Sequence, residues 1–313
     1  MRLLRLWPEN SHFPFMKWRR VTFPLSAIMS LVILGLFFLH GLNFGIDFRG
    51  GTLLELQAKS GTADAAQVRE QSNALGFGEV EVQEFGGQGS LSLRFPIQEG
   101  GEAAQSAVVQ KARDTFGQAY DFRRVETVGP RVSGELVQAG TLGVVLSLVA
   151  VLCYLWFRFE RNLATGALIG TLHDVLLTVG FFVVTQLEFN MTSIAAILTI
   201  VGYSLNETVV VFDRTRELLR RYKNMPDEEL LDLSINTTMS RTAITAMTTF
   251  LALLALVLFG GEAIEGFAIV MLVGIVICTY SAIFVSSPSL IYLGLRQSET
   301  QRAAAAKTVA AKP

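Results

Sequence analysis

The sequence predicts an α-helical polytopic membrane protein with six transmembrane helices and a folded α+β domain between the first two. Three observations support this fold class. Hydrophobic residues make up 51% of the 313 residues, charged residues only 17%, and the mean hydropathy is +0.44. Soluble domains carry about a quarter charged residues, so this composition is that of a membrane protein. Six apolar runs are long enough to cross a bilayer, and a long stretch after the first has a soluble composition.

The six apolar runs approach or exceed the roughly 20 residues that a spanning helix needs. The first run is longer than the apolar core of a signal peptide, and no small-x-small cleavage site follows it, so we expect it to be retained. The fifth is short and needs flanking Thr and Ser residues to reach the required length. The runs are Val21 to Gly41, Leu136 to Phe157, Leu163 to Val184, Ile194 to Phe212, Ala243 to Phe259 and Phe267 to Val285.

The positions of Lys and Arg predict on which side of the membrane each connection lies. They cluster before the first run, between the second and third, after the fourth and after the last, whereas turns 185–193 and 260–266 contain none. Both termini are therefore expected to be cytoplasmic and the long insert to lie on the opposite side. The predicted parts are a cytoplasmic segment 1–20, a first span 21–41, an external domain 42–135, a five-helix bundle 136–293 with a cytoplasmic loop 213–240, and a cytoplasmic tail 294–313.

The insert has the pattern of a folded domain. Alternating apolar residues predict strands at 52–58, 79–85, 90–95 and 121–128. Helical patterns lie at 62–75, where Thr62 or Asp64 is the start signal, and at 101–116. The order βαββαβ is that of the split βαβ, ferredoxin-like arrangement. Nothing in this domain suggests catalysis, and the glycines between 86 and 89 predict a hairpin turn rather than a phosphate loop.

Composition and missing motifs argue against several function classes. Lys and Arg number 26 against 27 Asp and Glu, so a net charge of −1 gives no basic excess for nucleic acid. The two cysteines, Cys153 and Cys278, lie in apolar runs and offer neither a disulfide framework nor a cysteine metal site. No G-x-x-x-x-G-K-[ST] loop and no H-E-x-x-H motif occurs. We therefore expect no metal, no cofactor and no enzymatic activity.

Ionisable residues inside the spans are the candidate functional residues, because a charge at mid-bilayer costs roughly 2.5 to 3.5 kcal/mol on insertion scales. His173 and Asp174 lie in the third span, Asn206 and Glu207 in the fourth, and Arg241 at the start of the fifth. Each of these spans carries a stripe of small residues that lets another helix approach, and we expect the three stripes to converge. The stripes are Gly166, Gly170, Asp174 and Thr178; Ala195, Thr199, Gly202 and Asn206; and Arg241, Thr245, Thr248, Ala252 and Ala255.

Glu207 and Arg241 are expected at similar depth, so the two side chains could meet. A buried carboxylate beside an arginine can take up or release a proton when the arginine moves slightly. The pair therefore outlines a proton relay, with Asp174, Asn206 and His173 as further candidate members. Two alternatives stay open: the pair could be a static buried ion pair that locks two helices, and His173 could be a packed histidine that donates to a carbonyl.

Five motifs of this sequence resemble those of the SecD/SecF family of bacterial protein-export subunits. They occur in the family's order, at its topological positions, and cover nearly the whole chain. The motif after the first span contains Gly45, Asp47, Gly50 and Gly51. The others are 128–136 with Gly129 and Pro130, the third-span motif 173–175, the fourth-span motif 202–214 with Gly202, Asp213 and Arg214, and 240–242 at the start of the fifth span.

The resemblance implies a member of the resistance-nodulation-division superfamily in the bacterial inner membrane, whose insert is the family's smaller periplasmic domain. It further implies a subunit that acts with SecD after the SecYEG channel and SecA. Such a subunit uses the proton-motive force to drive or complete translocation of unfolded polypeptides. YajC and YidC are further partners that the family suggests.

The resemblance also implies roles for individual residues. In the family, the acidic residue of the fourth span and the arginine of the fifth belong to the proton path, and they correspond to Glu207 and Arg241. The family usually has Asp where this chain has Glu207, so the carboxylate reaches one methylene further. Sodium coupling is seen in some relatives and stays open as an alternative to proton coupling.

Three other functions compete with this one. An intramembrane aspartyl protease built on Asp174 and Glu207 is disfavoured because Arg241 would favour ionisation of both carboxylates, and the usual Gly-x-Gly-Asp context is absent. A stand-alone small-molecule exporter of the same superfamily is disfavoured because such exporters carry two six-span units. A passive scaffold or assembly factor of the translocon, without proton coupling, is the stronger alternative.

Overall fold

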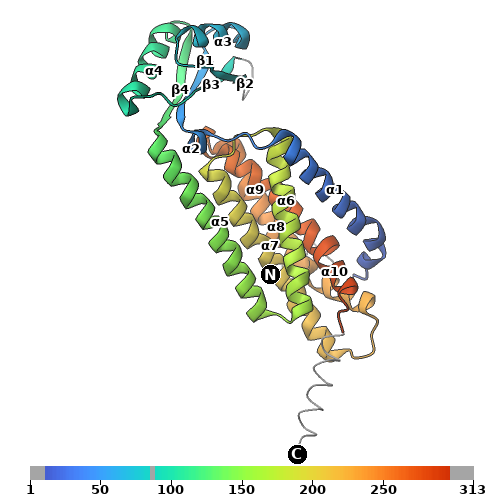
Figure 1. Ribbon diagram of the computed structural model, residues 1–313. Helices are drawn as coiled ribbons and strands as arrows, with labels where there is room; N and C mark the ends of the chain where they lie inside the picture. Colours follow the sequence, from blue (N-terminus) through green and yellow to red (C-terminus); the bar gives the residue numbers. More distant parts are fainter. Residues whose placement is uncertain (1–10, 85–88, 297–313) are drawn as a thin grey trace, which may run out of the picture. The chain divides into compact units, whose positions relative to one another are not determined.

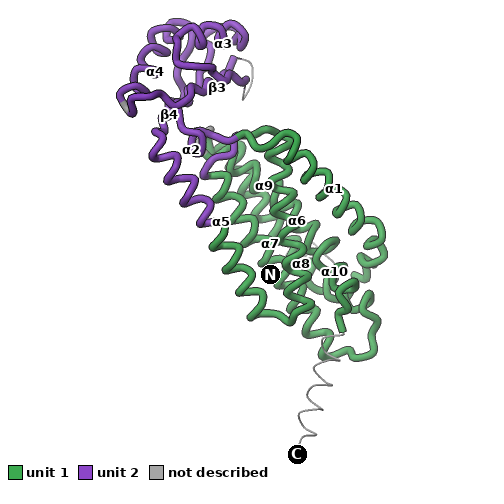
Figure 2. The backbone as a smooth tube through the Cα atoms, in the orientation of Figure 1, with its two compact units in different colours: residues 1–43, 144–187, 192–313 green, residues 44–143, 188–191 purple. Residues whose placement is uncertain are grey.

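The computed structural model describes residues 11–84 and 89–296, so most of the predicted tail 294–313 and the first half of segment 1–20 lie outside the described residues. The chain divides into two compact units (Figure 2). Unit 1 comprises residues 1–43, 144–187 and 192–313, and unit 2 comprises residues 44–143 and 188–191.

The described residues contain six helices long and apolar enough to span a membrane, which confirms the predicted fold class (Figure 1). Their bounds are α1 (Arg19–His40), preceded by the 3₁₀ turn η1 (Phe15–Trp18); α5 (Pro130–Arg158); α6 (Arg161–Thr185); α7 (Met191–Arg221); α8 (Asp227–Phe259); and α9 (Glu262–Ser281). The last of these continues through a π-helical segment η2 (Ala282–Ser286) into α10 (Ser287–Tyr292).

The helices extend beyond the apolar runs, because polar residues at their ends continue the same hydrogen-bonded ladder. The segment 213–240, expected as the connection between the fourth and fifth spans, is almost entirely helical: α7 continues to Arg221 and α8 starts at Asp227. Pro226 precedes α8, and three acidic residues occupy its first turn, where negative charge complements the helix dipole. The connection between the two helices is therefore short.

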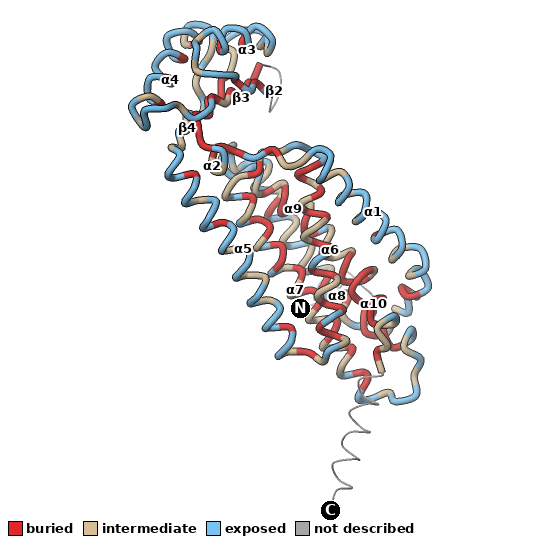
Figure 3. Tube along the Cα trace, viewed as in Figure 1, coloured by how far each residue is buried: buried red, intermediate tan, exposed pale blue. Residues whose placement is uncertain are grey.

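Helices α6, α7 and α9 form the interior of unit 1. About half of the apolar window of each is buried, against only 6% in α1 and α5 and 11% in α8. Figure 3 shows this contrast between α6 and the exposed α1. Small residues permit the close approach: a Cβ on Gly180 of α6 would lie 2.6 Å from Ile33 of α1, and a Cβ on Gly274 would touch Ile200.

Unit 2 contains a four-stranded antiparallel sheet of order β2-β3-β1-β4, the strand order of the ferredoxin-like arrangement. The strands are β1 (Gly51–Ala58), β2 (Glu81–Glu84), β3 (Ser90–Phe95) and β4 (Tyr120–Val128), and the helices are α3 (Ala65–Ala74) and α4 (Gly101–Phe116). Leu54, Leu56 and Leu93 of the sheet pack with Val68 of α3 and Val108 of α4 in the buried core.

Several local sequence signals in unit 2 correctly predicted where its helices and strands begin and end. Asp64 caps α3, because its carboxylate accepts hydrogen bonds from the backbone N–H groups of Ala66 (2.9 Å) and Gln67 (3.1 Å). Strand 90–95 and helix 101–116 have the predicted bounds. The short helix α2 (Ile46–Arg49) was not predicted, because four residues are too few for a periodic pattern.

Candidate functional site

Asp174 is enclosed between α6 and α7. The residue is 0% exposed, and Ser204 of α7 donates a hydrogen bond of 2.6 Å to Oδ2. On the other carboxylate oxygen, Oδ1, His173 places Nδ1 at 3.1 Å. Both carboxylate oxygens therefore have a partner that can donate a proton.

Glu207 is buried on α7 and is held by α8. Its residue exposure is 2%, and Thr245 Oγ1 donates to Oε1 over 2.9 Å. The same hydroxyl lies 3.0 Å from the carbonyl oxygens of Arg241 and Thr242 in its own helix. A hydroxyl has one hydrogen, so Thr245 can give it either to the carboxylate or to its own helix.

Arg241 does not meet Glu207. Its side chain is exposed, and among the residues that the structure describes it forms no ion pair. The static buried ion pair considered from the sequence is therefore absent. Arg241 precedes Thr245 by four residues, so the two lie on one face of α8, about 6 Å apart along its axis. The arginine lies one turn from the hydroxyl that binds Glu207.

The three small-residue stripes do not converge as predicted. The α6 stripe is buried, whereas the stripes of α7 and α8 largely face outward. The exposed members are Ala195, Thr199, Gly202 and Asn206 on α7, and Arg241, Thr248, Ala252 and Ala255 on α8. We call these eight residues the open face. Stripes of small and polar residues are surfaces on which transmembrane helices associate.

The two carboxylates are connected through α7, which carries both Ser204, the hydrogen-bond partner of Asp174, and Glu207. Ser204, which binds Asp174, and Glu207 are three residues apart, so they occupy neighbouring positions on that helix, about 4.5 Å apart along its axis. Each carboxylate is hydrogen-bonded by a hydroxyl of the adjacent helix. Hydroxyls both donate and accept, so the arrangement can hold and pass protons.

The two hydroxyl partners, Ser204 and Thr245, were not predicted as members of the site. Thr245 was noted as part of the α8 stripe, while Ser204 lies three residues before Glu207 inside the fourth-span motif. Their spacing of three or four residues from candidate ionisable residues was the available signal. Among the described residues, no group of three or more His, Cys, Asp or Glu side chains could hold a metal ion.

The motif after the first span shapes unit 2. Gly50 and Gly51 have φ values of +69° and +110°, which L side chains rarely adopt, and a Cβ on Gly51 would overlap the carbonyl oxygen of Phe95. Asp47 Oδ2 accepts a hydrogen bond of 2.9 Å from the backbone N–H of Met191, the first residue of α7. Gly45 donates its N–H to Phe189 O at 2.8 Å.

The remaining motif residues have structural contacts. Pro130 is the first residue of α5, where its missing N–H costs nothing, and Gly129 O accepts from Ser133 N at 3.0 Å. Arg158 at the end of α5 pairs with Asp213 of α7. Arg214 pairs with Glu217 at 2.6 Å and donates to Thr237 of α8.

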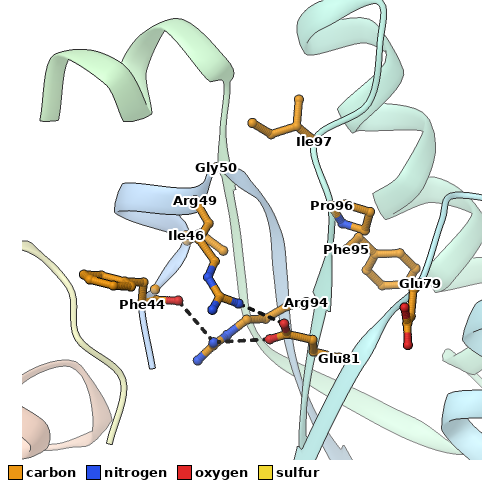
Figure 4. A pocket seen from close by; sticks show the side chains of 11 residues that line it. Phe44, Ile46, Arg49, Gly50, Glu79, Glu81, Arg94, Phe95, Pro96 and Ile97 are labelled. Carbon is orange, nitrogen blue, oxygen red and sulfur yellow. Dashed lines mark hydrogen bonds and ion pairs between the residues drawn. The ribbon is translucent and has the colours of Figure 1, made fainter. Parts of the chain in front are cut away.

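A cavity of about 390 Å³ lies within unit 2 (Figure 4). Arg49 pairs with Glu81 at 2.8 Å, and Arg94 lies 3.7 Å from Glu81 and 3.5 Å from Glu188. Glu79 also lines the cavity, so its wall carries charges of both signs.

Comparison with known proteins agrees with the resemblance seen in the motifs. Residues 108–296 match the family model described as protein export membrane protein SecD/SecF, C-terminal, and residues 35–62 match the SecD/SecF GG motif. The chain is 43% identical over 289 residues to the protein translocase subunit SecF of Rickettsia bellii, covering 92% of this chain and 95% of that protein.

Longer relatives contain a similar region. The chain is 46% identical over 299 residues to the protein translocase subunit SecDF of Brucella abortus, covering 96% of this chain but 39% of that protein. The crystal structure of SecDF from Thermus thermophilus, a translocon-associated membrane protein, aligns with a TM-score of 0.82 at 31% identity, covering 93% of this chain and 40% of that chain. The chain thus spans about two fifths of the SecDF proteins. These matches and the six apolar helices show that the chain belongs to the SecD/SecF family of protein translocase subunits and is a multi-pass inner-membrane protein.

Proposed function

We propose that this chain is a SecF-like subunit that acts with a SecD partner. Together they use the proton-motive force to drive or complete translocation of unfolded secreted polypeptides after SecYEG and SecA. The observation that carries the proposal is the buried Glu207, bonded to the hydroxyl of Thr245 one turn from Arg241. The protein acts without a metal or cofactor and catalyses no covalent reaction.

The open face supports the need for a partner. Asn206 and Arg241 are exposed at membrane depth or close to it, and polar side chains there are costly against lipid. SecDF relatives are about two and a half times the length that this chain covers, so those proteins contain a further part beyond the SecF-like unit. A SecD unit supplies that further part and covers the open face.

The coupling step follows from the contacts of Glu207. When a proton reaches its carboxylate, the negative charge disappears and the bond from Thr245 weakens, because hydrogen bonds to charged groups are stronger. Thr245 then returns its hydrogen to the carbonyls of its own helix, and α7 is released from α8. A later movement of Arg241 toward the carboxylate favours loss of the proton. One charge crossing about 100 mV supplies about 2.3 kcal/mol for this cycle.

Complementation tests the proposal in cells that lack the native subunit. Glu207→Gln and Arg241→Met should each cause secreted precursors to accumulate, while SecD still copurifies with the variant. Glu217→Gln is the matched control, because Glu217 is an exposed carboxylate on the same helix. Normal export by both variants would refute the role of Glu207 and Arg241.

A passive scaffold or assembly factor is the second candidate, and the motif contacts favour it. Asp47 binds the start of α7 and Asp213 pairs with Arg158, so several family motifs have structural roles. A scaffold predicts that Glu207→Gln lowers SecD recovery and export together. A proton-coupled subunit predicts that export falls while SecD recovery is unchanged.

The remaining proposals concern topology, partners and the coupling ion. We propose that both termini lie in the cytoplasm and unit 2 in the periplasm. Cysteine labelling from outside spheroplasts should therefore modify Glu79→Cys but not Lys223→Cys.

YajC and YidC are tested as partners by copurification with and without the chain. Replacing Na⁺ by K⁺ in a translocation assay separates proton coupling from sodium coupling.

A further inference from the structure

Three buried hydroxyl groups in unit 1 have no hydrogen-bond partner among the described residues. Ser281 and Ser286 are 0% exposed and Thr208 is 1% exposed, and no described residue bonds to any of the three hydroxyl oxygens. Buried Ser and Thr side chains in helices commonly bond a carbonyl of their own helix. Thr171 does so, with its hydroxyl 3.0 Å from Ala167 O.

The two serines lie against α6, one turn from Asp174. Asp174 follows Gly170 by four residues, so the two positions share one face of α6. A Cβ on Gly170 would lie 3.6 Å from Ser281 Oγ and would overlap Ser286 Oγ. Both hydroxyls therefore lie beside the same turn of α6.

Thr208 reaches the same level from α7. Ser204 bonds to Asp174 at 2.6 Å, which sets the level of the carboxylate on α7. Further along, the ring of Phe212 lies 3.4 Å from the position of a Cβ on Gly166. Thr208 lies midway between Ser204 and Phe212 on the same face of α7, four residues from each. It is therefore level with Gly170 of α6, beside which the two serines lie.

The backbone of α9 widens between the two serines. Ala282–Ser286 is π-helical, and such segments often occur at functional sites. In a π turn, the backbone hydrogen bond joins residues five apart, so Ser281 and Ser286 lie on the same side of the helix. Ser287 Oγ uses this wider turn to donate to Ala282 O at 2.7 Å, whereas the two cluster serines make no such bond.

We propose that Thr208, Ser281 and Ser286 bind water, and that this water extends the hydrogen-bonded path from Asp174 toward the Arg161 end of α6. Unpaired buried groups are explained by an ordered water or an ion. Water fits better than a sodium ion, because a hydroxyl that coordinates a cation uses its oxygen and leaves its hydrogen unpaired. Water accepts that hydrogen and donates another.

The role of the water in proton transfer rests on the proposed function, but its presence does not. Thr208→Val, Ser281→Ala and Ser286→Ala each remove one hydroxyl with little change of volume. Thr171→Val is the matched control, because its hydroxyl is already bonded within α6. Each variant is purified as the full chain in complex with SecD.

Infrared difference spectra in H₂¹⁶O and H₂¹⁸O detect internal water directly. The wild type and the control should show an isotope-sensitive O–H band that the three variants lose. The change in melting temperature is an independent test, because its direction differs between a dry and a hydrated cluster. If the cluster is dry, removing an unpaired hydroxyl leaves the protein equally or more stable, whereas loss of a hydroxyl that binds water lowers the melting temperature.

Translocation driven by an imposed pH gradient should fall about fivefold in Thr208→Val and Ser286→Ala and stay unchanged in the control. A fivefold loss of rate is the effect of losing about one net hydrogen bond. Absence of the band together with unchanged stability would overturn the proposal. Stabilisation by Na⁺ that the variants abolish would overturn it in favour of a cation site. Normal export by Glu207→Gln would refute the proposed function, and the infrared result would still decide whether water binds.

Discussion

Asp174 and Glu207 are both buried carboxylates bonded by a hydroxyl, but their surroundings differ. Around Asp174, the α6 stripe is closed by α7 and by the π-helical segment of the same chain. Around Glu207, the flanking stripes of α7 and α8 form the open face. The first region is complete within one chain. The second is exposed, and under the proposed function a partner covers it, so that one side of α7 serves packing within the chain and the other serves assembly.

The largest expected effect is on the closed side. Gly170→Val adds a branched side chain where even a Cβ would overlap Ser286 Oγ, so overpacking should destabilise unit 1 by about 1–3 kcal/mol or more. The yield of folded protein in detergent and its melting temperature measure this. A variant that is as stable as the wild type would contradict the close contact between α6 and η2.

The matched change on the open face should leave folding intact. Gly202 has nothing within 4 Å of an added Cβ, so Gly202→Val should keep the melting temperature of the isolated chain. Its branched side chain would obstruct a closely approaching helix, and SecD recovery should fall at least about tenfold, the equivalent of about 1.4 kcal/mol. Unchanged recovery would show that the partner does not dock on this face.

A smaller effect is expected when the link to Glu207 is removed without changing the charge. Thr245→Val deletes the donor to Oε1, and hydrogen bonds to charged groups contribute about 1.5–3 kcal/mol. Proton-driven export should fall about tenfold with SecD binding preserved. Thr248→Val is the control, because Thr248 bonds only carbonyls of its own helix among the described residues. Equal export by the two variants would contradict the role of Thr245.

The smallest effect concerns unit 2 at high pH. Burial, and then the negative charge of Asp64, raises the pKa of Tyr120. The folded state therefore holds this proton more tightly than the unfolded state, so the stability it contributes is present below the unfolded pKa of about 10 and is lost as pH rises further. Tyr120→Phe should flatten that decline, as measured by hydrogen exchange in β4. An unchanged pH dependence would exclude Tyr120 as its source.

The sequence predicts the spans and unit 2 well, because their signals are local. Asp64 begins α3 by bonding backbone N–H groups two and three residues away, and such a cap needs no tertiary context. The rotation of α7 and α8 is different. Both Asn206 and Glu207 lie in one motif, yet the first is exposed and the second buried, and only packing against neighbouring helices decides which.

Two features had no local signal at all. The π-helical segment Ala282–Ser286 continues an apolar run without any break in composition, so no local pattern predicts it. The outward position of Arg241 follows from the rotation of α8, since a small-residue stripe can face either its own chain or a partner. The Asp174 site could therefore be predicted more closely than the surroundings of Glu207.

The most direct test of the central claim is proton flux through purified complexes of this chain and SecD in liposomes, followed with a pH-sensitive dye inside. We predict that an imposed pH gradient and membrane potential drive proton entry in the wild type and in Glu217→Gln. Glu207→Gln should reduce it to the level of protein-free liposomes. Proton entry by Glu207→Gln at the wild-type rate would contradict the account.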